Sequence, residues 1–114
     1  MKINLLYVSS LIFIVGCSTN PNSMRSNSPD ALHSSVKSPK EISLCVANKW
    51  ETFGVVNQRD LSNGISLSSS LNGDLHYLVD ITSNGKSTIT KAYKFMSMSI
   101  GADPYLKAVS ECQI

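Results

Sequence analysis

The sequence lacks the charge density that binding to nucleic acid needs. Its 114 residues, enough for one small domain, carry 10 Lys and Arg against 8 Asp and Glu, a net charge of +2. The basic residues are scattered and form no block, whereas sequence-independent binding to nucleic acid needs many cations that neutralise phosphates. We therefore do not expect a nucleic acid as a partner.

The sequence also has few of the side chains from which metal sites and active sites are built. It contains two histidines, His33 and His76, and neither has a second His or Cys at the spacing of a metal site. We find no paired carboxylates and no nucleophile with a neighbouring base. The sequence therefore predicts no metal, no cofactor and no catalytic residue, and we interpret the chain as a non-enzymatic protein.

One motif copies part of a nucleotide site but lacks its context. The residues Gly85-Lys86-Ser87-Thr88 match the end of a phosphate-binding Walker A loop. That loop needs an earlier Gly where this chain has Asp80, and it opens a helix, whereas the residues after Thr88 alternate as in a strand. We therefore predict no nucleotide site and interpret these residues as a hairpin tip.

A hydrophobic run long enough to span a membrane is absent. A spanning helix needs about 20 apolar residues, whereas the run at the amino terminus extends only from Leu5 to Val15. Lys2 precedes this run and Gly16 ends it. A positive residue, a short apolar run and a small residue in this order are typical of a secretory signal that is removed.

The end of this run, Ile14-Val15-Gly16-Cys17, resembles the lipobox of bacterial lipoproteins, with Ile14 where Leu is commoner. The resemblance implies that residues 1–16 are removed and that Cys17 becomes a lipidated amino terminus. Several acyl chains anchor a protein firmly. Ser18 stands where lipoproteins retained in the inner membrane tend to carry Asp, so the resemblance implies the outer membrane, with the domain in the periplasm or at the cell surface. The alternative is an ordinary signal followed by a free thiol.

Residues 18–37 are rich in Ser, Asn and Pro, and their few apolar residues show no period. A segment of this composition cannot bury enough apolar surface to fold alone. We therefore expect residues 17–37 to be the lipidated Cys and a flexible tether. A flexible chain of this length reaches about 25 Å, or 5–6 Å times the square root of its length.

A helix is expected where the folded domain, residues 38–114, begins. Ser38 and Glu41 form a capping box with Pro at the first helical position. Apolar residues then share one helical face, interrupted by Lys49, and Gly54 is placed to end the helix. The residues of this face are Ile42, Cys45, Val46, Trp50 and Phe53.

A second helix is expected near the carboxyl terminus. Asp103 is a suitable cap and Pro104 a suitable first helical residue. The residues that recur with helical spacing after them are Tyr105, Ala108, Val109 and Cys112.

Four strands are expected between these helices. Three Asn-Gly pairs, which favour tight hairpin turns, separate segments whose apolar and polar residues alternate. The pairs are Asn63-Gly64, Asn72-Gly73 and Asn84-Gly85. The sequence therefore predicts an α+β fold: a helix, a four-stranded antiparallel meander and a helix, with both helices on one sheet face. In the third strand Leu75, Tyr77, Val79 and Ile81 are expected to share a face.

The two strands on either side of Asn84-Gly85 can pair in either of two registers. A two-residue loop sets Asp80 opposite Ile89, whereas a three-residue loop over residues 83–85 sets Val79 opposite Ile89. The second pairs apolar with apolar side chains, so we predict the three-residue loop.

A disulfide between Cys45 and Cys112 is expected. With Cys17 lipidated, these two cysteines remain in an oxidising compartment, and each lies on the apolar face of one predicted helix. Closing a loop of this length stabilises a protein by about 4 kcal/mol in the loop-entropy description. Two buried free thiols are the alternative.

These features favour a membrane-anchored envelope lipoprotein that acts as a non-catalytic binding or structural accessory, with an envelope protein or peptidoglycan as its partner. One alternative is an inhibitor of an envelope-directed enzyme such as a lysozyme, for which Asn84, Gly85 and Lys86 at a hairpin tip are the candidate contact. Another is a component of a secretion, conjugation or phage-exclusion assembly, which predicts an exposed apolar patch or an open strand edge.

Overall fold

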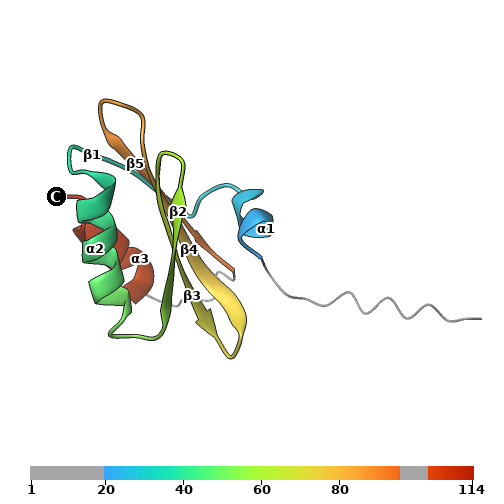
Figure 1. The fold of residues 1–114 in the computed structure, drawn as a ribbon. Coiled ribbons are helices and arrows are strands. Elements are labelled where there is room, and N and C mark those ends of the chain that lie inside the picture. Colours follow the sequence, from blue (N-terminus) through green and yellow to red (C-terminus); the bar gives the residue numbers. More distant parts are fainter. Residues whose placement is uncertain (1–19, 96–102) are drawn as a thin grey trace, which may run out of the picture.

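The computed structural model describes residues 20–95 and 103–114, so the expected signal segment and Cys17 lie outside the described residues. Within this part the chain forms three helices and five strands (Figure 1). No helix in these residues is long and apolar enough to cross a membrane. The elements are α1 (Pro21–Arg25), β1 (Ala31–Ser35), α2 (Pro39–Trp50), β2 (Val56–Leu61), β3 (Gly64–Leu71), β4 (Asp74–Ser83), β5 (Thr88–Lys94) and α3 (Pro104–Glu111).

The sheet has five antiparallel strands, in the order β1-β5-β4-β3-β2, so the predicted four-stranded sheet is wrong. Strands β2 to β5 follow one another as a meander, and β1 pairs with β5 at the edge. Asp30 extends this pairing, since its N–H donates to the Ala92 carbonyl (2.8 Å) and its side-chain Oδ2 accepts from the Lys94 N–H (2.8 Å). Residues 31–35, assigned to the tether from composition, therefore belong to the fold.

The helices lie on both faces of the sheet (Figure 1). Helices α2 and α3 cover one face, which we call the helical face, and α1 lies on the other, which we call the α1 face. A short helix and a short strand thus form inside the segment that was expected to be flexible. The composition of the segment did not predict these two elements. Only a few side chains of α1 contact the sheet, and β1 is held by backbone hydrogen bonds to β5.

Local capping explains why α2 and α3 begin where they do. Ser38 Oγ accepts from the Glu41 N–H at 3.2 Å, and Asp103 Oδ1 accepts from the N–H groups of Tyr105 and Leu106 at 2.9 and 3.3 Å. Helix α2 ends at Trp50, before the expected Gly54, and residues 51–53 form a turn.

The main core lies between the helical face and the two long helices. Trp50 is fully buried there, and its indole N–H donates to the Tyr105 carbonyl at 3.0 Å. The remaining core residues are Ile42, Val46, Leu67, Val79, Ile81, Ala92, Tyr105, Ala108, Val109 and Cys112.

The register of β4 and β5 differs from both predicted registers. Val79 lies opposite Ala92 and Asp80 opposite Lys91, with a four-residue connection over residues 84–87. Ile89 consequently lies on the α1 face and Thr90 on the helical face, where its Oγ1 donates to Gln113 Oε1 at 3.3 Å. Matching apolar with apolar residues failed because the α1 face is also partly covered.

A register shift in the β3–β4 pairing moves one predicted core residue to the other face. Ser69 lies opposite Tyr77 but Ser70 lies opposite Leu75, so His76 is the extra residue in β4. Strict alternation predicts that Leu75 and Tyr77 share a face. The extra residue places Leu75 on the opposite face instead. Leu75 joins Met24, Leu78 and Tyr93 in a small second core beneath α1.

Candidate functional site

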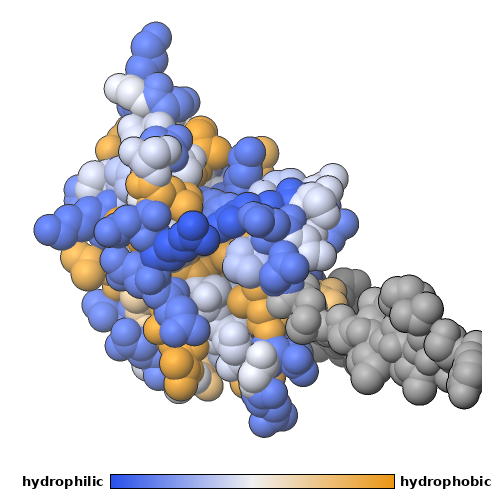
Figure 2. Space-filling view, turned by 45° about the vertical axis from the view of Figure 1, so that its right-hand side comes forward, coloured by the Kyte–Doolittle hydropathy of each residue, from blue (hydrophilic) through white to orange (hydrophobic). Residues whose placement is uncertain are grey.

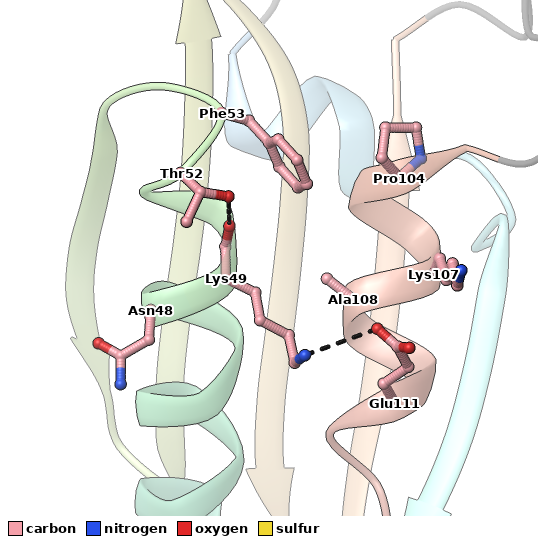
Figure 3. A pocket seen from close by; sticks show the side chains of 8 residues that line it. All are labelled: Asn48, Lys49, Thr52, Phe53, Pro104, Lys107, Ala108 and Glu111. Carbon is pink, nitrogen blue, oxygen red and sulfur yellow. Dashed lines mark hydrogen bonds and ion pairs between the residues drawn. The ribbon is translucent and has the colours of Figure 1, made fainter.

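A groove of about 490 Å³ lies between α2 and α3, near the end of α2 and the start of α3 (Figure 3). We call it the helix groove. Its volume falls in the range of about 300–1,000 Å³ that is usual for ligand sites. Its apolar lining consists of Phe53, Pro104 and Ala108, and its charged lining of Lys49, Lys107 and Glu111.

Phe53 is held at the groove by the turn that follows α2. Its N–H donates to the Trp50 carbonyl at 2.8 Å, and the neighbouring Thr52 hydroxyl donates to the Lys49 carbonyl at 2.6 Å. The Phe53 ring packs against Tyr105 with a centroid separation of 5.1 Å, yet 47% of the residue stays exposed. An aromatic side chain is therefore presented to solvent on an ordered backbone.

Three aromatic rings pack together behind Phe53, of which Trp50 and Tyr105 are buried and Tyr77 is partly buried. Tyr105 stacks on Tyr77 with centroids 4.0 Å apart and planes 8° apart, and Trp50 meets Tyr105 edge-on at 5.3 Å. The Tyr77 hydroxyl donates to Asp103 Oδ2 at 2.8 Å. Burial and then this hydrogen bond raise the pKa of Tyr77 well above its ordinary value. Tyr105, the ring against which Phe53 packs, is therefore held between other aromatic side chains.

The charged side chains of the groove carry one net positive charge. Lys49 Nζ lies 3.6 Å from Glu111 Oε1, and this ion pair bridges the two helices (Figure 3). Both side chains are nearly half exposed, so the pair contributes little stability. Lys107 is exposed and has no ion pair within the residues that the structure describes. It is therefore a cation that an anionic group can approach.

The predicted disulfide between Cys45 and Cys112 is confirmed, and it joins α2 to α3 beyond one end of the groove. Its Cα atoms are 5.7 Å apart and its residues 67 apart in sequence. The bond fixes the separation of the two helices, and hence the width of the groove. The alternative of two free thiols is thereby excluded.

The hairpin-tip candidates lie on the turn between β4 and β5, where all three are exposed. Asn84 Oδ1 accepts from the N–H groups of Lys86 and Ser87 at 3.0 and 2.9 Å, and Gly85 adopts a φ of +94°. The Asn84 oxygen is therefore used within the turn, which leaves the Lys86 ammonium as the group that the tip presents. The tip lies beside the start of α2, so the fold does not bring it to the helix groove.

The sequence alone does not predict the helix groove, because Phe53 continues the apolar spacing of the helix expected to end at Gly54 and is therefore expected in its core. A usable signal was nevertheless present. A disulfide between two helices makes them neighbours, so Lys49 and Glu111, each close in sequence to one of the cysteines, could have been placed on facing helices.

No group of three His, Cys, Asp or Glu side chains in residues 20–95 and 103–114 is arranged to hold a metal ion. No family model, curated protein or solved structure matches this chain. The amino-terminal motif and the geometry of the domain therefore carry what can be inferred about function.

Proposed function

We propose that this protein is an outer-membrane lipoprotein, anchored through Cys17, whose domain is a non-catalytic binding accessory of the bacterial cell envelope. The observation that supports a binding role is the helix groove, where half-exposed Phe53 packs against Tyr105 and where Lys107 has no ion pair within the described residues. Lipidation rests on the lipobox-like residues 14–17.

The chemistry of the groove favours one kind of partner, an envelope protein that inserts an apolar side chain next to a carboxylate. Phe53, Pro104 and Ala108 offer apolar surface, and Lys107 offers a positive charge at the rim. Aromatic side chains that are already ordered lose little entropy on binding and often dominate interface energies. The disulfide and the ring stack supply that order here.

Site-specific photo-crosslinking in cells tests this proposal. A photoreactive amino acid is placed in the full chain at Asn48, which lines the groove, at Lys86, which lies at the hairpin tip, or at Ser110, which is exposed on α3 outside the groove. We expect one discrete envelope protein to be captured from position 48 and not from position 110. Adding Phe53→Ala should abolish that capture, while circular dichroism shows that the domain remains folded.

Other outcomes of the same experiment contradict the groove proposal in different ways. Capture from position 86 alone, insensitive to Phe53→Ala, would support the inhibitor alternative. Attachment of peptidoglycan rather than protein at position 48 would replace the proposed partner. Equal capture from positions 48 and 110 would show that the groove is not a specific site.

A further inference from the structure

Helix α1 is attached to the sheet by one buried side chain and one ion pair. Met24 is 3% exposed and packs on Leu78 and Tyr93. Arg25 binds Asp80 through two bonds, Nε to Oδ2 at 2.7 Å and Nη2 to Oδ1 at 2.9 Å. Bidentate pairs of this kind are strong and directional. Helix α1 is therefore part of the folded body.

The position of α1 limits how far the domain can stand from a lipid on Cys17. Asn20, the first described residue, is three residues after Cys17, and each residue spans at most about 3.6 Å, or about 11 Å in all. The 25 Å tether expected from composition is thus replaced by a much shorter link. Helix α1 lies on one sheet face and the long helices on the other (Figure 1). An anchor within about 11 Å of Asn20 would therefore keep the α1 side of the domain close to the lipid.

The charges beside α1 suit an anionic surface. Arg59 of β2 lies opposite Ser66, and Lys91 of β5 lies opposite Asp80, so both share the face that Arg25 contacts. Both are exposed and have no ion pair within the described residues. Arg25 neutralises Asp80, the acidic residue of β4 beside Lys91. Figure 2, which brings the α1 side forward, shows a band of strongly hydrophilic side chains there.

We infer that the α1 face lies on the anionic lipid surface in which Cys17 is anchored, with Arg59 and Lys91 toward the lipid headgroups. This inference rests on the lipidation proposed above. The helix groove, on the opposite face of the sheet, then points away from the bilayer, where a partner can reach it. In this arrangement the α1 face contacts lipid, and the helical face remains open to a protein partner.

Two exposed serines on opposite faces provide a matched test. Ser34 of β1 points to the α1 face, because the next residue, Ser35, donates its hydroxyl to Gln113 on the helical face (2.6 Å). Ser110 is exposed on α3. Each is changed to Cys in the full lipidated chain and labelled with a nitroxide. The protein is then reconstituted in vesicles of phosphatidylethanolamine and phosphatidylglycerol that contain a nickel-chelating lipid.

We expect nickel in the headgroup region to increase the spin relaxation rate of the nitroxide at position 34 several-fold more than that of the nitroxide at position 110. Equal relaxation at both positions, or a larger effect at position 110, would overturn the inference. The failure of lipidation is recognised separately, because unlipidated protein does not float with the vesicles, whereas misoriented protein floats and shows equal relaxation.

A charge reversal tests the role of the basic residues. Lys91→Glu should lower the relaxation at position 34 on vesicles with phosphatidylglycerol, but not on vesicles of neutral phosphatidylcholine with the same nickel lipid. Lys40→Glu, the same change at an exposed residue of α2, should leave it unchanged. Equal effects of the two variants would contradict a specific contact between the α1 face and lipid.

Discussion

At the scale of single residues, Tyr77 of β4 and Asp103 together connect β4, α3 and β5. The Tyr77 ring stacks under Tyr105 of α3, and its hydroxyl donates to Asp103, which also caps that helix. The Lys94 ammonium lies 3.7 Å from the same carboxylate. Asp103 therefore links the start of α3 to β4 and β5, and the Tyr77 phenol must stay protonated to donate to it.

The raised pKa of Tyr77 predicts how stability responds to alkali. Below about pH 10 the phenol is protonated in both the folded and the unfolded chain, so its full contribution is present. Above that pH the unfolded chain loses the proton first, binds fewer protons than the folded chain, and is favoured as pH rises. We expect the free energy of unfolding, measured by urea titration, to fall steadily above about pH 10.

Tyr77→Phe tests the assignment of this pH dependence. The variant should be less stable near pH 7, because Asp103 loses the phenol as one of its donors, but its stability should decline less steeply in alkali. Phe53→Leu, which removes a ring that does not ionise, should keep the wild-type slope. An unchanged slope in Tyr77→Phe would contradict the role given to this phenol.

At the scale of elements, the Cys45–Cys112 bond between α2 and α3 is the strongest constraint. Replacing both cysteines by Ala should lower the free energy of unfolding by about 4 kcal/mol for a loop of this length. Such a loss is comparable to the whole stability of many small domains. In urea unfolding, reductant should destabilise the wild type to the same degree and leave the double variant unaffected. Equal stability of the variant and the oxidised wild type would contradict this account.

The β3–β4 pairing depends on a glycine at its edge. A Cβ at Gly64 would lie 2.8 Å from Thr82 Cα and 2.9 Å from the Ile81 carbonyl carbon, and both contacts are with backbone. Gly64→Ala should therefore destabilise the domain by about 3 kcal/mol, toward the upper end for overpacking. Gly73→Ala, at a φ of +84° in open space, should cost about 1 kcal/mol from backbone strain alone. Thermal unfolding compares the two, and an equal cost would argue against tight packing at Gly64.

The elements differ in how well the sequence predicts them, for physical reasons. Helices α2 and α3 begin at local caps, Ser38 and Asp103, which neighbouring residues suffice to recognise. The Asn-Gly pairs mark where the three hairpins of the meander turn, but only Asn72-Gly73 forms a two-residue turn with positive φ at both residues. Strand β1 was missed because an edge strand is held by backbone bonds to β5, and Ser and His side chains give no apolar alternation.

The register of the last hairpin failed for a related reason. Matching apolar pairs assumes one buried face, but Met24 of α1 gives the second face a small core of its own. Tyr93 could then lie on the α1 face and the smaller Ala92 on the helical face, beneath the long helices. The groove was missed similarly, since the position of Phe53 depends on the turn after α2.

At the scale of the whole molecule, the two faces of the sheet have different neighbours. Helices α2 and α3 form the groove on one side of the sheet, while α1 lies on the other (Figure 1). With the lipid that we propose on Cys17, a link of at most about 11 Å keeps the α1 side of the domain close to the bilayer.

The lipid on Cys17 is the central claim on which this orientation depends, and palmitate labelling tests it most directly. Cells that produce the full chain, or its Cys17→Ala variant, are grown with labelled palmitate, and the protein is purified and its label measured. Cys17→Ser is a second variant that preserves the size of the residue. We predict that the wild type carries label and that both variants carry none. Label that persists in the variants, or a wild type without label, would contradict the account.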